Sequence, residues 1–172
     1  NLNKQLFSNL DIKGVPKALK NTAFPFEFNN LNQLKKIINN HNIGIIKMEV
    51  FRNIKPKNNF LKKVRKLASR KKIILIFDEC TSGFRETNGG LHKKYKVNPD
   101  IAVFGKALGN GYAITSIIGK KAIMEAAQNT FISSTFWTER IGPSAALKTL
   151  EIMEKERSWE QLTLKGETLR KI

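Results

Sequence analysis

An acidic pair and a lysine each follow a short apolar run, at places where two strands of a sheet would end. The run 73–77 leads into Asp78 and Glu79, and the run 101–105 leads into Lys106. Ligands of an open α/β sheet bind beyond the carboxyl ends of its strands. We therefore expect a carboxylate and an amine to emerge side by side at one edge of a sheet.

Asp78 and Lys106 together suit the chemistry of pyridoxal phosphate. The lysine amine would form a Schiff base with the aldehyde of the cofactor, and the carboxylate would keep the pyridine nitrogen protonated, so that the ring absorbs carbanion electrons. Taken singly, Asp78 could be a solvated acid at the start of a loop, and Lys106 could be one of 24 solvated lysines. The prediction therefore depends on both residues meeting at one site.

The segments around these residues alternate between strand-like and helix-like patterns. Apolar residues recur at helical spacing in some segments and form short uninterrupted runs in others. Strands are expected over 43–48, 73–77, 101–104 and 112–118, and helices over 31–38, 60–68, 120–128, 143–153 and the last dozen residues. Strand, helix, strand is the unit of a parallel sheet, so we predict an α/β fold with a mostly parallel sheet and flanking helices. Residues 1–172 show no internal repeat or linker and are expected to form one unit.

The composition excludes several classes of protein. The chain has 172 residues, of which 41% are hydrophobic, so it has the material for a core and is not expected to be disordered. With a single cysteine, Cys80, and two histidines, it lacks a disulfide framework and a Cys/His zinc site. No apolar run approaches the roughly 20 residues that cross a bilayer, and the first residues show no signal segment. We therefore expect a soluble, cytoplasmic protein with no membrane partner and no metal.

The formal charge of +17 raises nucleic acid as a partner. The lysines and arginines, however, are spread along the whole chain in short pairs, and no basic stripe is interleaved with aromatic residues as in single-strand binders. Lysine, asparagine, isoleucine and phenylalanine are all abundant, which indicates a general bias rather than selection on one surface. We therefore expect no nucleic-acid partner.

Four stretches of the chain have the pattern of a known family. They are Ile-Phe-Asp-Glu-Cys-Thr-Ser-Gly-Phe-Arg at 76–85, Asn-Pro-Asp-Ile at 98–101, Phe-Gly-Lys-Ala-Leu-Gly-Asn-Gly at 104–111 and Ser-Thr-Phe at 134–136. In order and spacing they resemble class III aminotransferases, a pyridoxal-phosphate family that includes glutamate-1-semialdehyde aminomutase. The resemblance extends from about Gly14 to the end of the chain.

The resemblance implies part of the large domain of a fold type I enzyme, which is similar to aspartate aminotransferase. Family members are over twice as long, so this chain would be a partial cofactor-binding domain without the N-terminal phosphate cup and the C-terminal small domain. Asp78 would bind the pyridinium nitrogen, and Lys106 would be the Schiff-base lysine. Cys80 stands where valine commonly packs against the ring. Thr135, with Ser134 as the alternative, matches the threonine that reaches the cofactor phosphate of the partner subunit.

The function that the resemblance implies is a transaminase, which moves an amino group between an amino donor and a carbonyl acceptor in a homodimer with shared sites. The alternatives are a glutamate-1-semialdehyde-type aminomutase, or an inactive fragment that acts only as a basic binding module. A P-loop-like ATPase is more remote. The run into Asp78 and Glu79 resembles a Walker B strand, but Gly105 and Lys106 are followed by Ala107, and no Walker A loop occurs.

Three further residues have no settled role. Glu49 matches a family glutamate that is usually followed by proline, whereas Val50 follows here. Arg85 either captures a substrate carboxylate or makes a structural salt bridge. His92 lies in a lysine-rich loop, where we expect a solvated rather than a catalytic side chain.

Overall fold

The structure, a computed structural model, describes residues 14–136 and 138–171. It divides into two compact units, which meet in the sequence between Ile43 and Gly44. The described part of the first unit contains the 3-10 turn Lys17–Leu19 and helix α1 (Leu31–Asn40). The Asn30 side chain begins α1 by accepting a hydrogen bond from the Gln33 N–H at 3.0 Å, as a capping asparagine does. The helix predicted over 31–38 is confirmed.

The second unit contains the sheet and its helices. Its strands are β1 (Ile45–Glu49), β2 (Ile74–Asp78), β3 (Ile101–Phe104) and β4 (Ser116–Gly119). Its helices are α2 (Phe60–Lys71), α3 (Lys121–Met124), α4 (Ile141–Glu156) and α5 (Ser158–Leu169), with 3-10 turns at Leu91–Lys93, Lys106–Leu108 and Glu125–Asn129. No helix among the described residues is long and apolar enough to span a bilayer.

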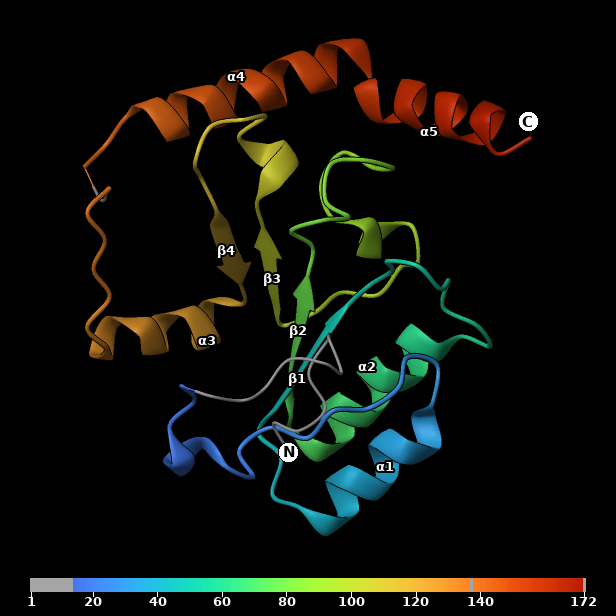
Figure 1. The fold of residues 1–172 in the computed structure, drawn as a ribbon, viewed down its shortest axis with the longest axis vertical. Helices are drawn as coiled ribbons and strands as arrows, with labels where there is room; N and C mark the ends of the chain where they lie inside the picture. Colours follow the sequence, from blue (N-terminus) through green and yellow to red (C-terminus); the bar gives the residue numbers. More distant parts are fainter. Residues whose placement is uncertain (1–13, 137, 172) are drawn as a thin grey trace. The chain divides into compact units, whose positions relative to one another are not determined.

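The four strands pair in the order in which they occur in the chain, as Figure 1 shows. Strands β1, β2 and β3 are parallel, and β4 runs antiparallel to β3. Glu49 pairs with Asp78 across β1 and β2, and Asp78 pairs with Val103 across β2 and β3. The carboxyl ends of the three parallel strands therefore meet at one edge. The predicted α/β fold with a mostly parallel sheet is confirmed.

The strand predicted over 112–118 is wrong in its first half. Strand β4 begins only at Ser116, because the preceding residues form a turn in which the Tyr112 N–H donates to the Gly109 carbonyl at 3.1 Å. A Cβ on Gly109 would lie 2.3 Å from the Tyr112 carbonyl oxygen, so the turn requires glycine there. The connection from β3 to β4 is too short for the helical crossover that a parallel strand needs. The chain therefore reverses, and β4 pairs antiparallel.

One face of the sheet packs against α2. Alternate residues of the strands are buried, as period-2 side-chain orientation requires. The buried residues are Ile46, Met48, Leu75, Phe77, Ala102 and Phe104 from the strands, and Phe60, Leu61, Val64, Leu67 and Ala68 from α2. Burying a large apolar side chain contributes about 1.5–3 kcal/mol, so this layer supplies much of the stability of the unit.

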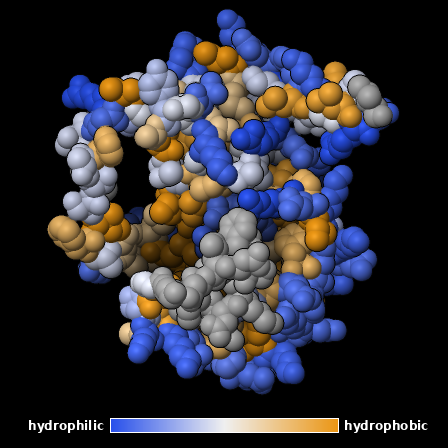
Figure 2. All heavy atoms as spheres, in the orientation of Figure 1, coloured by the Kyte–Doolittle hydropathy of each residue, from blue (hydrophilic) through white to orange (hydrophobic). Residues whose placement is uncertain are grey.

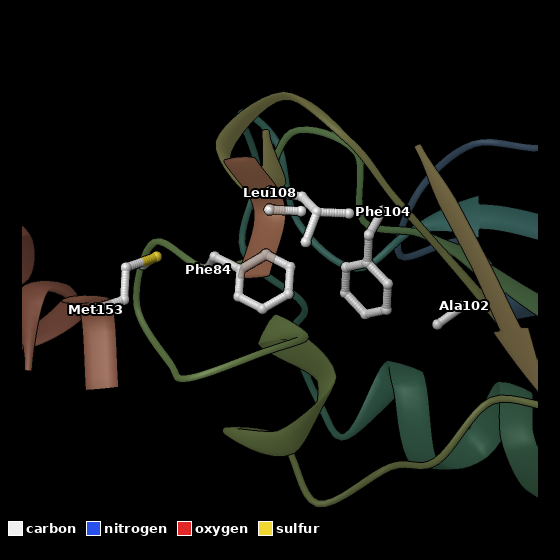
Figure 3. Close-up of a cluster of buried hydrophobic side chains, with 6 residues drawn as sticks. Phe84, Ala102, Phe104, Leu108 and Met153 are labelled. Carbon is white, nitrogen blue, oxygen red and sulfur yellow. The ribbon is translucent and has the colours of Figure 1, made fainter. Parts of the chain in front are cut away.

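A second hydrophobic cluster lies between the end of β3 and α4. It consists of Phe84, Ala102, Phe104, Leu108, Ala146 and Met153. Figure 3 shows the rings of Phe84 and Phe104 next to each other, with Leu108 beside them and Met153 reaching in from α4. The two ring centroids are 5.3 Å apart with the planes tilted by 53°, a favourable aromatic pairing. This cluster fixes the 3-10 turn Lys106–Leu108.

On the face of the molecule in Figure 2, hydrophobic side chains of α4 and α5 are interspersed with hydrophilic ones. Leu147 of α4 is 70% exposed and Leu164 of α5 is 66% exposed. These two helices thus bury little apolar surface apart from the residues that α4 contributes to the cluster.

A buried aspartate at the start of β3 connects four elements. One oxygen of Asp100, Oδ2, accepts hydrogen bonds from Arg65 of α2 at 2.7 Å and from the Leu75 N–H at 2.8 Å. Its other oxygen, Oδ1, lies 2.7 Å from the Lys120 Nζ, next to α3. Burial raises the pKa of Asp100, but the bonds from Leu75, Lys120 and Arg65 outweigh it and lower the pKa to about 2.

We expect this network to make the stability of the protein sensitive to acid. Because the pKa of Asp100 is depressed in the folded state, its contribution is present above the unfolded pKa of about 4 and is lost as the pH falls towards 2. The shift corresponds to about 2 kcal/mol of unfolding free energy. Urea unfolding of Asp100→Asn and wild type between pH 7 and pH 2.5 measures it.

Glu151→Gln is the control for Asp100→Asn, because Glu151 pairs with Lys148 on the exposed surface of α4 at 2.8 Å. A surface pair of this kind contributes little to stability. Equal losses in the two variants would contradict the assignment, as would an unchanged acid dependence in Asp100→Asn.

Candidate active site

The structure brings Asp78 and Lys106 to the same edge of the sheet. Asp78 is the last residue of β2, and its register partner is Val103 of the neighbouring parallel strand. Lys106 follows the end of β3 by two residues. Both groups therefore lie at the carboxyl ends of adjacent parallel strands, where α/β proteins bind ligands. The two residues thus share the edge at which the sequence predicted them, and their roles at a common site stay predictions.

The Asp78 carboxylate has a partner at each oxygen. Oδ1 accepts the Cys80 N–H at 3.2 Å, and Oδ2 lies 3.1 Å from the Lys47 Nζ of β1. Burial raises the pKa of Asp78, but the hydrogen bonds from Lys47 and Cys80 and the charge of Lys47 hold it below its ordinary value. Asp78 is therefore ionised at neutral pH and suited to bind a cationic or N–H group.

Lys106 is held in an uncommon backbone conformation at the start of its 3-10 turn. Its φ of +48° lies in the left-handed region, which costs an ordinary residue about 1–2 kcal/mol. Its carbonyl accepts the N–H groups of Gly109 and Asn110 at 3.2 and 3.1 Å, and its Nζ donates to the Thr81 hydroxyl at 2.7 Å. Such outliers cluster at functional sites, where the surrounding structure holds them.

Cys80 lies between these two strand ends. It is half-buried, and its sulfur is 3.5 Å from where a Cβ on Gly105 would be. Burial raises the pKa of the Cys80 thiol, and the neighbouring carboxylate of Asp78 raises it further. The thiol is therefore neutral and acts as a small apolar group, which suits the ring-packing position that the sequence predicted.

Glu79 is a structural residue whose role the sequence reasoning missed. It is fully buried, and its Oε1 accepts both the N–H and the Nδ1 of His92 at 2.9 Å. Its Oε2 accepts the Leu91 N–H at 3.0 Å and the Ser82 hydroxyl. Burial raises the pKa of Glu79, but these hydrogen bonds lower it further than burial raises it. Glu79 thus fastens the loop after β2 back onto the end of that strand.

The expectation that His92 is solvated is wrong, because the side chain is buried against Glu79. The lysines that follow His92 suggested an exposed loop, yet the imidazole turns inward while Lys93 and Lys94 stay exposed. The sequence signal for this burial is the adjacent pair Asp78 and Glu79. Neighbouring residues at a strand end point to opposite faces, so one of the two carboxylates must point inward and needs a buried hydrogen-bond partner.

The loop that Glu79 fastens is also fixed by close packing. A Cβ on Gly83 would lie 2.8 Å from the Glu79 carbonyl oxygen and 2.7 Å from the Phe104 ring, so only glycine fits. Arg85 donates through Nε to the Thr81 carbonyl at 2.7 Å, a structural hydrogen bond rather than the salt bridge considered from sequence. The loop therefore holds the Thr81 hydroxyl against the Lys106 amine.

A cavity of about 760 Å³ lies between the Lys106 turn and helices α4 and α5. Arg85 and Lys148 contribute positive charge to its lining, and Tyr112 an aromatic ring. Lys106 lines this cavity, whereas Asp78 and Cys80 do not. The cavity therefore adjoins the candidate site without containing all of it.

The structure does not test Thr135 or its alternative Ser134 directly. Both are exposed, in the irregular segment between the 3-10 turn Glu125–Asn129 and α4. The Ser134 hydroxyl accepts the Phe136 N–H at 3.2 Å, and the neighbouring Phe131 is 97% exposed. An exposed threonine is compatible with a contact to another subunit, so the assignment stays a prediction.

Comparison with known proteins shows the family. Residues 53–171 match the family model for aminotransferase class-III. The 3-aminobutyryl-CoA aminotransferase of Cloacimonas acidaminovorans (strain Evry) is 39% identical over 162 residues, which cover 89% of this chain and 39% of that protein. The glutamate-1-semialdehyde 2,1-aminomutase of Nitrosopumilus maritimus (strain SCM1) is 36% identical over 150 residues, which cover 83% of this chain and 35% of that protein.

Solved structures show the same fold. The FumI protein of Sphingopyxis sp. MTA144, in its PLP internal aldimine form, superposes with a TM-score of 0.78 at 25% identity and covers 83% of this chain and 36% of that one. The ornithine aminotransferase of Toxoplasma gondii superposes with a TM-score of 0.76 at 22% identity, covering 85% and 36%. This chain spans less than half the length of each of these proteins. By its sequence and its fold, the chain belongs to the class III aminotransferase family.

Proposed function

We propose that the whole protein is a pyridoxal-phosphate-dependent transaminase that moves an amino group from an amino donor to a carbonyl acceptor. The observation that carries this proposal is the placement of Asp78 and Lys106 at one edge of adjacent parallel strands, in a chain of this family. The bound cofactor supplies an electron sink for the carbanion that forms when a proton leaves the substrate.

The residues present fit this cofactor. The ionised Asp78 carboxylate would accept the ring N–H and so keep the ring nitrogen protonated. The Lys106 amine would attach the cofactor covalently through Nζ and, once displaced by substrate, would take up and return the substrate proton. In the cofactor-free chain, the Lys106 Nζ donates to the Thr81 hydroxyl, which orients the amine. Cys80 would pack against the ring face.

An internal amino shift, as in an aminomutase, is the alternative reaction. It is supported by the 36% identity to a glutamate-1-semialdehyde aminomutase. Asp78 and Lys106 would have the same roles in both reactions, which differ in whether the product of the first amino transfer leaves or stays bound and reacts a second time. We further propose a cytoplasmic homodimer in which Thr135 reaches the cofactor phosphate of the partner subunit, with small amino and carbonyl compounds as substrates.

Replacing Lys106 tests the covalent attachment. In the full-length protein, Lys106→Ala should abolish the visible absorption band that pyridoxal phosphate gives on reacting with a protein lysine, because Lys106 carries the amine that hydrogen-bonds to Thr81 at this edge. Borohydride reduction of the wild type should fix the cofactor mass on the peptide that contains Lys106, as mass spectrometry would detect.

The matched control is Lys121→Ala, which removes an exposed lysine at the start of α3 and should leave the band unchanged. Circular dichroism should show that Lys106→Ala keeps its fold. Normal turnover by Lys106→Ala, or reduction of the cofactor onto a different lysine, would refute the assignment.

Replacing Asp78 tests whether its carboxylate serves mainly to raise the reaction rate or to bind the cofactor. Asp78→Asn keeps the shape of the side chain but not the charge that protonates the ring nitrogen. We expect its rate with a panel of amino donors to fall by about 10²-fold or more, while cofactor affinity falls much less. Stopped-flow absorbance and cofactor titration measure the two quantities. Equal rates in Asp78→Asn and wild type would rule out the electronic role.

A further inference from the structure

Three charged side chains from neighbouring strands share one face of the sheet at its carboxyl edge. Glu49 of β1 is the register partner of Asp78 of β2, so their side chains point to the same side. Lys47 precedes Glu49 by two residues and therefore also points to that side. One ammonium thus lies on the same face as two carboxylates, Asp78 and Glu49.

Lys47 pairs with the carboxylate that the proposed cofactor needs. Its Nζ lies 3.1 Å from Oδ2 of Asp78, while Oδ1 of the same carboxylate accepts the Cys80 N–H at 3.2 Å. Each oxygen could accept one more hydrogen bond, but a protonated ring nitrogen beside the Lys47 ammonium would place two cations on one carboxylate, so the ring N–H competes with Lys47 for Asp78. The Cys80 N–H belongs to the backbone that continues β2, whereas the Lys47 side chain is 61% exposed and flexible. Lys47 is the partner that can move.

Glu49 offers a second place for that ammonium. Its Oε1 makes a long contact to the Arg52 Nη1, at 3.4 Å. Its Oε2 is buried and has no hydrogen-bond partner within residues 14–136 and 138–171. A buried acceptor without a partner is costly, more so when it is charged. An ammonium that moved from Asp78 to Glu49 would remove this cost.

We propose that Lys47 is a positioning residue that exchanges carboxylates when the cofactor binds: it holds Asp78 in the empty protein and passes to Glu49 when the ring nitrogen takes its place. This inference rests on the proposed function. No proton is transferred, since one cationic donor replaces another on Asp78 and the displaced ammonium pairs with Glu49. The exchange keeps Asp78 ionised and oriented before the cofactor arrives.

The exchange predicts that Lys47 and Glu49 have opposite effects on the affinity for the cofactor. Without Glu49, the displaced ammonium can pair only with water, which compensates it less than a carboxylate, so it competes more strongly with the ring for Asp78 and the cofactor binds more weakly. Without Lys47, the ring meets no competitor and binds more tightly, and Glu49 becomes irrelevant to the affinity. The effect of Glu49 should therefore depend on the presence of Lys47, which simple structural damage would not reproduce.

The test is a double-mutant cycle in the full-length protein with pyridoxal phosphate as the titrated ligand. We expect Glu49→Gln to weaken cofactor binding by about tenfold, because a charge within about 4–6 Å shifts such an equilibrium by a unit or more. Lys47→Met should tighten binding, and the double variant should match Lys47→Met. Lys47→Arg should behave as wild type, and Lys121→Met is the neutral control for an exposed lysine.

A second measurement needs no cofactor. Carboxyl NMR of the empty protein should show the pKa of Asp78 rising in Lys47→Met and staying low in Lys47→Arg and Glu49→Gln, because only the first variant removes the cation. Thermal unfolding identifies any variant that does not fold, and Lys47→Gln then replaces Lys47→Met.

The outcomes distinguish the two proposals. The exchange is overturned if Glu49→Gln weakens cofactor binding equally in the presence and absence of Lys47, or if the pKa of Asp78 is unchanged in Lys47→Met. The proposed function stands in both cases. If the wild-type protein does not bind pyridoxal phosphate at all, the proposed function fails and the exchange fails with it.

Discussion

The parallel pairing of β2 with β3 is the constraint on which the candidate site depends. Parallel strands end at the same edge, so Asp78 and Lys106 meet there although 27 residues lie between them. An antiparallel pairing of the same strands would place them at opposite edges. The buried Asp100 maintains this pairing from the other end, because it immediately precedes β3 and accepts the Leu75 N–H from β2. The sheet thus fixes which residues can meet before any cofactor is involved.

The adjacent acids Asp78 and Glu79 divide two tasks between them. Successive residues at a strand end point to opposite faces, so Asp78 faces the edge where a ligand can bind while Glu79 turns into the protein. Burying the Glu79 carboxylate would cost much free energy without partners, and His92 and the N–H groups of the loop after β2 offset that cost by hydrogen bonding to it. That loop in turn presents Thr81 to Lys106. One acid therefore supplies the chemistry and its neighbour holds the loop that positions the amine.

The sequence predicted the fold and the position of Asp78 and Lys106 at one edge of the sheet, because apolar periodicity and strand order determine both. It did not predict the burial of His92, the start of β4 at Ser116, or the pairing of Lys47 with Asp78. Each of these depends on contacts between residues that periodicity does not connect. The partner of Glu79 lies 13 residues away, and the partner of Asp78 lies on another strand. Exposed lysines look alike in a sequence with 24 of them, so the one beside a functional carboxylate is found only from the structure.

The strained backbone of Lys106 shows which part of the core serves the site. A residue with a left-handed backbone persists only where breaking its neighbouring contacts would cost more free energy than relaxing the backbone would gain. At Lys106 those contacts come from Leu108, which is buried against Phe84, Phe104 and Met153. Helix α2 contributes no residue to this cluster. The layer packed against α2 therefore stabilises the sheet. The hydrophobic cluster between β3 and α4 orients the turn that carries the Lys106 amine. Because Phe84 and Met153 join that cluster from the loop after β2 and from α4, a change in either segment would reach the Lys106 turn through Leu108 and Phe104.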